Sequence, residues 1–320
     1  MIVVPDDFPS VFEGSAAHDQ ARRLGEVRLH SERGAEEEAE LIRRIGDARV
    51  AINIRAYARF SDAVFQACPA LKMISIWGTG TDNVDLDAAA RHGVTVCNTP
   101  GVNAIAVAEH TFALMLAVAR HLCRIDRDMR AGEWPRDMLA QLHGKTLGLF
   151  GTGAIGSRVA ALARAFGMEV LGWSARGEPG RLRAQGITPG AKEQILRRAD
   201  VITLHLRLTP ETRNFIGAEA FALMKKDVIV VNTGRGALID RDALVDALSS
   251  GRIAGAGLDV FHDEPIKPGD PLLGLPNTVL SPHNAGQTPE VRRDGLLLAV
   301  KNIENFLAGH PTNVVAGSSG

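Results

Sequence analysis

Short apolar runs alternate with windows of helical periodicity along the first hundred residues. The apolar runs are rich in β-branched residues and predict strands at Ile2–Val4, Val27–Leu29, Val50–Ile54, Leu71–Ile76 and Val94–Cys97. Helical windows lie between them, for example Ala35–Ile45 and Ser61–Ala67. Strands that alternate with helices indicate βαβ units, which build a parallel sheet.

The same alternation resumes after residue 145. Strands are predicted at 145–150, Glu169–Trp173, Val201–Leu206, Val228–Asn232, Ile253–Asp259 and Thr278–Leu280. Predicted helices in this stretch include Ser157–Phe166 and Asp240–Ser249. A final helix is predicted over Pro289–Leu307, and we expect it to return to the first part of the chain.

Two segments between these stretches differ from the rest. Asn103–Arg120 has the pattern of one long helix that is apolar on most sides, so it needs cover from its own fold or from a second subunit. Arg124–Leu142 is polar and contains Trp134 and Pro135, which predicts a surface excursion or an interface arm.

The composition narrows the class of protein. A chain of 320 residues is long enough for two domains of ordinary size. Its net charge of −1 gives no broad attraction to nucleic acid or to anionic membranes. The three cysteines lack metal-ligand spacing, and the N-terminus lacks the basic segment of a signal peptide. We therefore expect a cytoplasmic protein without nucleic-acid or membrane partners.

A glycine-rich turn carries the strongest functional signal. The strand at 145–150 runs directly into Gly151-Thr-Gly153-Ala154-Ile155-Gly156, and a helical pattern follows. Gly151 permits a tight turn, Gly153 lets the backbone approach phosphates, and Gly156 allows close packing of helix and strand. The helix N-terminus offers free N–H groups and a positive dipole end. The turn predicts a dinucleotide site built from Gly151, Gly153, Ala154, Ile155 and Gly156.

The next strand bears on the choice between NAD and NADP. An NAD-binding domain commonly has an acidic residue for the adenosine ribose about 20 residues after the glycine turn. Here Trp173 is followed by Ser174-Ala-Arg176, which suit a 2′-phosphate better than a carboxylate would. This favours NADP. The alternative is that Arg176 is an ordinary loop cation and Glu178 binds the ribose, which leaves NAD open.

Three charged or titratable residues follow the ends of successive predicted strands. Arg235 follows Val228–Asn232, Glu264 follows Ile253–Asp259, and His283 follows Thr278–Leu280. Each alone has an ordinary explanation as a surface cation, a loop acid or a turn residue. Together they lie where open α/β sheets bind ligands, beside a nucleotide loop, which predicts an active site.

At these residues the chain resembles the D-isomer-specific 2-hydroxyacid dehydrogenases, through the glycine loop, Asn-Thr-Gly-Arg-Gly (232–236), Asp-Glu-Pro (263–265) and Ser-Pro-His (281–283). The resemblance implies that Arg235, Glu264 and His283 are catalytic. It also implies that Asp259 contacts the nicotinamide carboxamide, and Thr233 is a further cofactor candidate. The loop with Gly78, Thr79 and Gly80 looks like the family's substrate-carboxylate loop.

The family resemblance also implies an architecture. A Rossmann-type, doubly wound parallel cofactor domain (100–286) is inserted into a flavodoxin-like α/β substrate domain (1–99 and 287–320). The resemblance further implies a homodimer built mainly through the cofactor domain. No metal is expected, because no His/Cys/Asp cluster suggests one.

We therefore expect an NAD(P)-dependent oxidoreductase that transfers a hydride between the cofactor and C2 of a small D-2-hydroxy acid or 2-oxo acid. Arg235 would grip the carboxylate and His283 would act as general acid/base, oriented by Glu264. A co-repressor-like, nucleotide-sensing interaction protein of the same fold is the alternative. Formate dehydrogenase and adenosylhomocysteinase are further relatives, but the Asp263-Glu264 and Ser-Pro-His283 motifs favour the hydroxyacid branch.

The sequence leaves the identity of the substrate undetermined. Arg55 lies where phosphoglycerate dehydrogenases carry a phosphate-binding arginine, and it is equally well explained as a surface cation. Ser174 points instead toward reduction of glyoxylate or hydroxypyruvate, since phosphoglycerate dehydrogenases usually have an acid at the ribose position.

Overall fold

The computed structural model describes residues 1–55, 57–175 and 179–317. The chain divides into two compact units, which are described separately below. Unit 1 comprises Met1–Asn103 and Gln287–Gly320, and unit 2 comprises Ala104–Gly286. The chain leaves unit 1 after Asn103, whereas the sequence predicted a boundary after residue 99.

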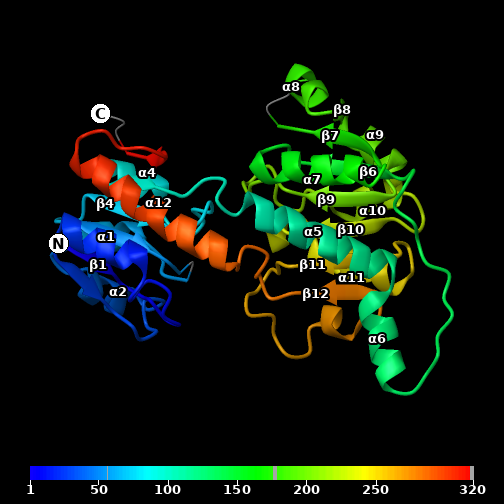
Figure 1. Cartoon of the computed structure of the whole chain (residues 1–320), viewed down its shortest axis with the longest axis horizontal. Coiled ribbons are helices and arrows are strands. Elements are labelled where there is room, and N and C mark those ends of the chain that lie inside the picture. The colour runs from blue at the N-terminus through cyan, green and yellow to red at the C-terminus, as the bar shows by residue number, and fades with distance from the viewer. Residues whose placement is uncertain (56, 176–178, 318–320) are drawn as a thin grey trace. The chain divides into compact units, whose positions relative to one another are not determined.

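Unit 1 contains a six-stranded sheet in the order β13-β5-β4-β3-β1-β2 (Figure 1). All neighbouring strands are parallel except β13, which is antiparallel to β5. The order β2-β1-β3-β4-β5 is that of flavodoxin-like folds. The strands are β1 (Ile2–Val4), β2 (Val27–Leu29), β3 (Val50–Asn53), β4 (Met73–Ile76), β5 (Thr95–Cys97) and β13 (Val314–Ala316).

Helices cover both faces of this sheet because alternate strand residues point to opposite sides. Ile2 and Val4 of β1 belong to one apolar cluster, with residues of α1 (Ala16–Leu24) and α12 (Pro289–Leu307). Val3 belongs to the other cluster. The helices of that second face are α2 (Glu38–Ile45), α3 (Asp62–Ala67) and α4 (Leu86–Arg91).

Unit 2 contains a seven-stranded parallel sheet in the order β12-β11-β10-β9-β6-β7-β8 (Figure 1). The chain starts at β6 in the interior, builds outward through β7 and β8, and then continues on the other side from β9. This reversal beside β6 is the switch point at which doubly wound folds bind ligands. The strands are β6 (Thr146–Phe150), β7 (Glu169–Trp173), β8 (Thr188–Pro189), β9 (Val201–Leu204), β10 (Ile229–Asn232), β11 (Gly255–Leu258) and β12 (Thr278–Leu280).

Helices pack on both faces of the second sheet as well. One face is covered by α5 (Ala104–Ala119) and α7 (Ala154–Ala165). The other face is covered by α9 (Lys192–Arg198), α10 (Ala218–Leu223) and α11 (Arg241–Ser249). The predicted apolar helix is α5, and its own unit buries most of it. Apart from α6 (Leu122–Arg130), the other described helices of this unit are α8 (Pro179–Ala184) and two short 3₁₀ turns, η1 (Gly236–Leu238) and η2 (Pro271–Gly274).

The segment after α5 contains a helix that was not predicted. Leu122–Arg130 forms helix α6, where the sequence predicted a surface excursion or an interface arm from Arg124 onward. Its apolar residues Leu122, Ile125 and Met129 have helical spacing, but none of its residues is buried. Residues 131–142 follow without helix or strand, outside the sheet of unit 2 (Figure 1).

No single helix in the described ranges is long and apolar enough to span a membrane. Helices α5 and α6 meet the length and composition criteria only together, and the pair is bent by 60°.

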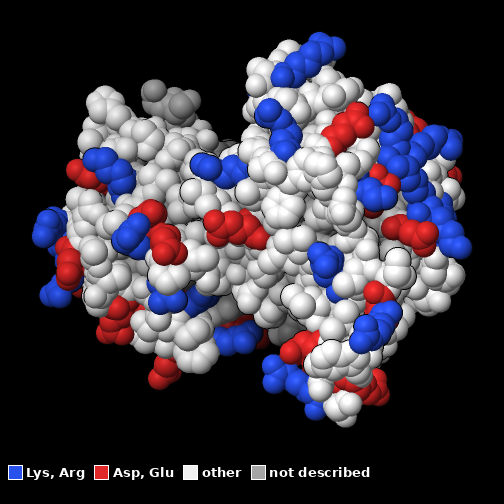
Figure 2. All heavy atoms as spheres, turned by 45° about the vertical axis from the view of Figure 1, so that its right-hand side comes forward, with Lys and Arg blue, Asp and Glu red and all other residues white. Residues whose placement is uncertain are grey.

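Charged side chains of both signs are interspersed on the face shown in Figure 2. Several of them pair within unit 2, such as Arg198 with Glu169 at 3.0 Å and Lys225 with Asp200 at 2.9 Å. Exposed pairs of this kind add little stability, but they neutralise charge locally.

Candidate active site

The glycine turn has the geometry that its sequence predicts. Gly151 has a φ of +96°, and a Cβ there would lie 2.4 Å from the carbonyl oxygen of His205. A Cβ on Gly156 would lie 2.0 Å from the carbonyl oxygen of Gly151. Side chains are excluded at both positions because real Cβ atoms do not approach backbone so closely. The turn and the start of α7 are therefore packed tightly against the ends of β6 and β9.

The outward side of the same turn suits a diphosphate. Gly153 is the N-cap of α7, it provides no side-chain cap, and a Cβ on it would meet nothing within 4 Å. The first N–H groups of α7, including those of Ala154 and Ile155, have no partner within the helix and carry its positive dipole end. An open cradle of glycine and free N–H groups fits the phosphates of a dinucleotide.

Only some of the residues predicted to select between NAD and NADP belong to the described part of the chain. Ser174 directly follows β7 and is half-buried, while Arg176 and Glu178 lie outside the described residues. A residue that sequence reasoning missed, Arg181 of α8, contacts the glycine turn. Its Nη1 lies 3.3 Å from the Thr152 carbonyl oxygen and its Nη2 lies 3.4 Å from Thr152 Oγ1. A guanidinium charge thus lies beside the phosphate cradle.

His283 and Glu264 form a close pair. His283 Nδ1 lies 2.7 Å from Glu264 Oε2, and Glu264 Oε1 accepts a 3.0 Å hydrogen bond from the Phe261 N–H. Partial burial acts to raise the pKa of Glu264, but the hydrogen bonds from His283 and Phe261, with the charges of His283 and Arg235, outweigh it and lower the pKa. Glu264 is therefore an ionised acceptor near neutral pH, and His283 Nδ1 is the donor.

Arg235 lies on the neighbouring loop, directly after β10. Asn232 shapes this loop: its Nδ2 donates to the Arg235 carbonyl at 2.9 Å, and its Oδ1 accepts from the Gly234 N–H at 3.0 Å. Arg235 Nη1 donates to the Gly234 carbonyl at 2.8 Å. A Cβ on Gly236 would lie 2.1 Å from the backbone of Phe261, so this loop and the Glu264 loop pack backbone against backbone. The predicted trio thus lies on adjacent loops of unit 2.

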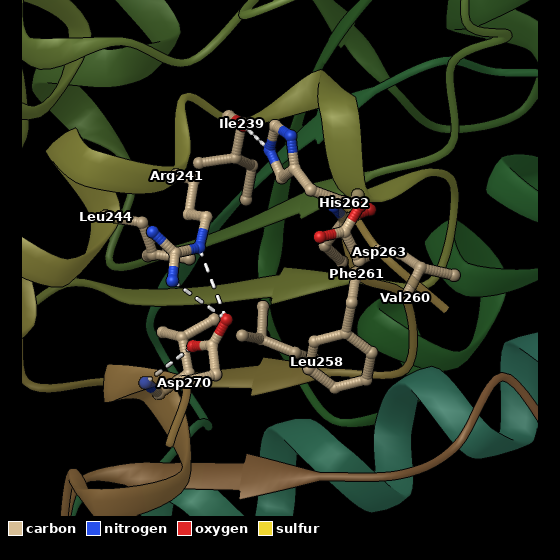
Figure 3. A pocket seen from close by; sticks show the side chains of 12 residues that line it. Ile239, Arg241, Leu244, Leu258, Val260, Phe261, His262, Asp263 and Asp270 are labelled. Atoms are coloured by element: carbon tan, nitrogen blue, oxygen red, sulfur yellow. Dashed lines mark hydrogen bonds and ion pairs between the residues drawn. The ribbon is translucent and has the colours of Figure 1, made fainter. Parts of the chain in front are cut away.

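Two further contacts tie these loops together, and Figure 3 shows both. His262 Nε2 lies 2.8 Å from the Ile239 carbonyl, which joins the Glu264 loop to the segment after Arg235. The Asp270 carboxylate accepts a 2.9 Å hydrogen bond from Arg241, the first residue of α11. Because a carbonyl only accepts, His262 must carry a proton on Nε2. No sequence motif pointed to this role of His262, because the contact depends on how the two loops pack.

Two cavities of unit 2 do not fit the expected substrate site. The pocket in Figure 3 has a volume of about 30 Å³, which suffices for water and not for a 2-hydroxy acid. A larger one, of about 300 Å³, is lined by Ala254, Asn277 and Thr278 among others. These residues lie at the amino ends of β11 and β12, at the edge opposite to His283 and Glu264.

Asp259 and Thr233 are buried, whereas Glu264 and His283 are exposed. The Asp259 side chain is buried, and its carboxylate accepts from the hydroxyl of Ser281 at 2.6 Å and from the N–H groups of Asn284 and Ala285 at 3.0 Å each. Thr233 Oγ1 lies 3.0 Å from Thr111 Oγ1 of α5. The hydrogen bonds of the Asp259 carboxylate therefore go to the loop around His283, and His110 Nε2 of α5 lies 3.5 Å from its Oδ1.

The predicted substrate-binding residues of unit 1 differ in whether their hydrogen-bond donors are already engaged within the unit. The N–H of Gly78 donates to Thr99 Oγ1 at 2.8 Å, so this donor is engaged within the unit. Thr79 and Gly80 are half-buried and show no backbone N–H bond to another described residue. Arg55 donates from Nη2 to the carbonyl of Pro9, while its Nε is buried without a partner in the described part of the chain.

No group of three or more His, Cys, Asp or Glu side chains suited to a metal occurs among the described residues. Residues 112–285 match the profile described as "D-isomer specific 2-hydroxyacid dehydrogenase, NAD binding domain". The chain belongs to the D-isomer-specific 2-hydroxyacid dehydrogenase family. Its expected fold class, with a Rossmann-type cofactor domain, is confirmed.

Curated relatives agree with this family. A glyoxylate reductase of Aeropyrum pernix is 44% identical over 264 residues, which cover 79% of this chain and 78% of that protein. A hydroxypyruvate reductase of Blautia hydrogenotrophica is 35% identical over 300 residues, covering 91% of this chain and 92% of the relative.

Solved structures with the same fold agree with this assignment. An acyclic imino acid reductase in complex with NADPH and D-Arg matches with a TM-score of 0.90 and 30% identity, covering 98% of this chain and 99% of the other. A D-lactate dehydrogenase from Aquifex aeolicus, complexed with NAD and lactic acid, matches with a TM-score of 0.87 and 30% identity over all of both chains. The chain is an NAD(P)-dependent oxidoreductase of 2-hydroxy acids, and these findings give no support to the co-repressor alternative.

Proposed function

We propose that this dehydrogenase reduces glyoxylate or hydroxypyruvate, or oxidises the corresponding D-2-hydroxy acid, with Arg235, Glu264 and His283 as its catalytic residues. The observation that carries the proposal is the 2.7 Å pair between His283 and Glu264, on a loop adjacent to that of Arg235. The names of the glyoxylate and hydroxypyruvate reductases among its relatives support the choice of substrate.

The protonation of His283 follows from its partner. Glu264 is an acceptor only, so His283 Nδ1 keeps its proton and Nε2 is the atom that exchanges one with the substrate. During reduction, His283 Nε2 gives its proton to the oxygen on C2 as hydride reaches C2, and the carbonyl becomes a hydroxyl. During oxidation the same nitrogen takes the proton back. The nicotinamide, when bound, supplies or accepts the hydride.

Arg235 is proposed to bind the substrate carboxylate. Its guanidinium is planar and always charged, so it can hold a carboxylate in two parallel hydrogen bonds. Thr79 and Gly80 are proposed to add backbone N–H donors, with Gly78 giving the turn its φ of +140°. Arg55 remains a candidate for a phosphate on the substrate, although its described bond goes to Pro9.

A kinetic comparison tests these roles. His283→Ala should reduce kcat strongly while the affinity for NAD(P)H, measured by fluorescence quenching, stays within about twofold. Arg235→Ala should raise KM for the 2-oxo acid and also lower kcat, because the ion pair aligns C2. The panel should contain hydroxypyruvate, glyoxylate, pyruvate and 3-phosphoglycerate with both cofactors. Full turnover in His283→Ala would disprove the proposed acid/base role.

We propose NADP(H) as the preferred cofactor. Ser174 in place of an acidic residue supports this choice, and the guanidinium of Arg181 beside Thr152 adds a positive charge near the same strand end. Arg176 is proposed to contribute as well, and Arg176→Ala should raise KM for NADPH selectively. An equal rise for NADH would remove this argument. Thr233 and Asp259 are proposed to contact the nicotinamide side.

A homodimer is the proposed assembly, with α6 and residues 131–142 as the contact. Trp134 is 71% exposed and Met138 is 96% exposed, which is unusual for large apolar side chains unless they meet a partner. The expected dimer should sediment at twice the chain mass. Trp134→Glu combined with Met138→Glu should convert it to a monomer, and a wild-type monomer would contradict the assembly.

We further propose that residues 1–99 with 287–320 form the substrate domain and that 100–286 form the cofactor domain. A cytoplasmic location is proposed from the three unpaired cysteines, of which Cys68 and Cys97 are buried.

A further inference from the structure

His283 has a backbone conformation that side chains rarely adopt. Its φ is +52°, in the left-handed region. The backbone of a non-glycine residue is strained there, so the surrounding structure must hold it in place. The same conformation directs the imidazole to Glu264.

Asp259 makes the contacts that hold this loop. Its backbone oxygen accepts from the His283 N–H at 2.7 Å. Its carboxylate accepts from the N–H groups of Asn284 and Ala285, the two residues after His283. Asp259 is fully buried, with 0% of its surface exposed, so water does not compete for these bonds. One buried carboxylate therefore fixes the backbone on the C-terminal side of the strained residue.

Ser281 and His110 complete the surroundings of that carboxylate. Ser281 Oγ lies 2.6 Å from Asp259 Oδ1, and His110 Nε2 lies 2.8 Å from Ser281 Oγ. The carboxylate accepts only, so the Ser281 hydroxyl donates to Asp259 and receives a hydrogen bond from His110 Nε2–H. A directed chain of hydrogen bonds thus runs from α5 through Ser281 to Asp259.

We infer that His110 and Ser281 are positioning residues for His283. They act through Asp259, which they orient toward the N–H groups of Asn284 and Ala285, and so they keep His283 Nδ1 on Glu264. This inference rests on the proposed role of His283, and it assigns a function to two residues that do not touch the reacting atoms.

The test uses full-length variants that remove or restore each donor. Ser281→Ala and His110→Leu break the chain, whereas Ser281→Thr keeps the hydroxyl and His110→Gln keeps an N–H donor. Thr278→Val is the matched control, because Thr278 begins β12, donates from Oγ1 to the carbonyl of Leu275 before that strand, and forms no hydrogen bond with Asp259 in the described part of the chain. The readouts are kcat and KM for a 2-oxo acid, NADPH affinity, and the downfield Nδ1–H proton signal of His283 in the protein without ligand.

We expect Ser281→Ala and His110→Leu to lower kcat by about tenfold, with NADPH affinity and KM within about twofold of wild type. The His283 Nδ1–H signal should weaken or disappear in both, and it should return in Ser281→Thr and His110→Gln. An unchanged signal and unchanged kcat in both donor-free variants would overturn the inference. If wild type reduces no 2-oxo acid, the proposed function fails, and the His283 signal still decides the positioning role on its own.

Discussion

His283 Nδ1 lies 2.7 Å from Glu264 Oε2, although 19 positions separate the two residues in the chain. The bond fixes which imidazole nitrogen is available for proton transfer, because a carboxylate leaves Nδ1 only the role of donor. Both side chains remain partly exposed, at 44% and 37%, so a substrate can reach them. The predictions below test this pair and the groups that support it.

Glu264→Gln should lower kcat by about 10- to 100-fold, because the neutral amide no longer stabilises the imidazolium formed during oxidation. The pKa of Glu264 is lowered from its ordinary value of 4.5, with His283 among the groups that lower it. Its contribution to stability is therefore present above about pH 4.5 and is lost as the pH falls through the lower, folded value. Urea unfolding at several acid pH values should show this loss in wild type and not in the variant. Glu219→Gln serves as the exposed control.

His205 should make the cofactor unit sensitive to acid. Burial lowers the pKa of His205 to about 3, and its Nδ1 is buried without a partner among the described residues. Folding favours the neutral ring, so this contribution to stability is complete above about pH 6.5 and declines as the pH falls toward 3. The free energy of unfolding should fall by up to about 1.4 kcal/mol per pH unit in that window. His205→Asn should flatten the curve, whereas the exposed His310→Asn should not.

Gly156→Ala and Gly153→Ala should differ in their effects on thermal stability. A Cβ on residue 156 collides with the Gly151 carbonyl, so this variant should lose thermal stability and bind NADPH at least about tenfold more weakly. A Cβ on residue 153 meets no protein atom within 4 Å, so only cofactor binding should suffer. Calorimetry with and without NADPH distinguishes the two effects. Gly180→Ala, which also meets nothing within 4 Å, is the control.

Arg181→Ala should weaken NADPH binding by about tenfold and leave NADH binding within about twofold, because only NADPH carries the additional phosphate. Isothermal titration with both cofactors measures the difference. Arg183→Ala removes an equal charge from the same helix and should have little effect. Equal losses for the two cofactors in Arg181→Ala would assign Arg181 to the diphosphate instead.

His262→Ala should lower kcat by about five- to tenfold with little change in NADPH affinity, because it releases the Glu264 loop from Ile239. His262→Gln keeps an N–H donor at a similar reach and should restore most of the activity. Lys267→Ala is the matched control, since it breaks an exposed ion pair with Asp263 on the same loop. A loss of activity in the control equal to that in His262→Ala would refute the role of His262.

Much of the fold was predictable because its signals are local. Short apolar runs and helical patterns predicted β1, β2, β7, β12 and α12 with the bounds that the structure has. The glycine turn was equally clear, because Gly151, Gly153 and Gly156 lie within six residues and each serves a local need of the backbone for a turn or a close approach. Helix α6 was not predicted; its apolar residues Leu122, Ile125 and Met129 have helical spacing but are not buried against the rest of the unit.

The sequence alone determined which residues follow the strand ends, and that was enough to nominate Arg235, Glu264 and His283. Only the tertiary structure decided how they are held: the bond of His283 to Glu264, the burial of Asp259 beneath the His283 loop, and the contact of Arg181 with Thr152. Periodicity and turn chemistry report interactions between neighbours in the chain. The hydrogen bonds that orient the site join residues 19 or more positions apart, and their geometry exists only once the strands and helices have packed.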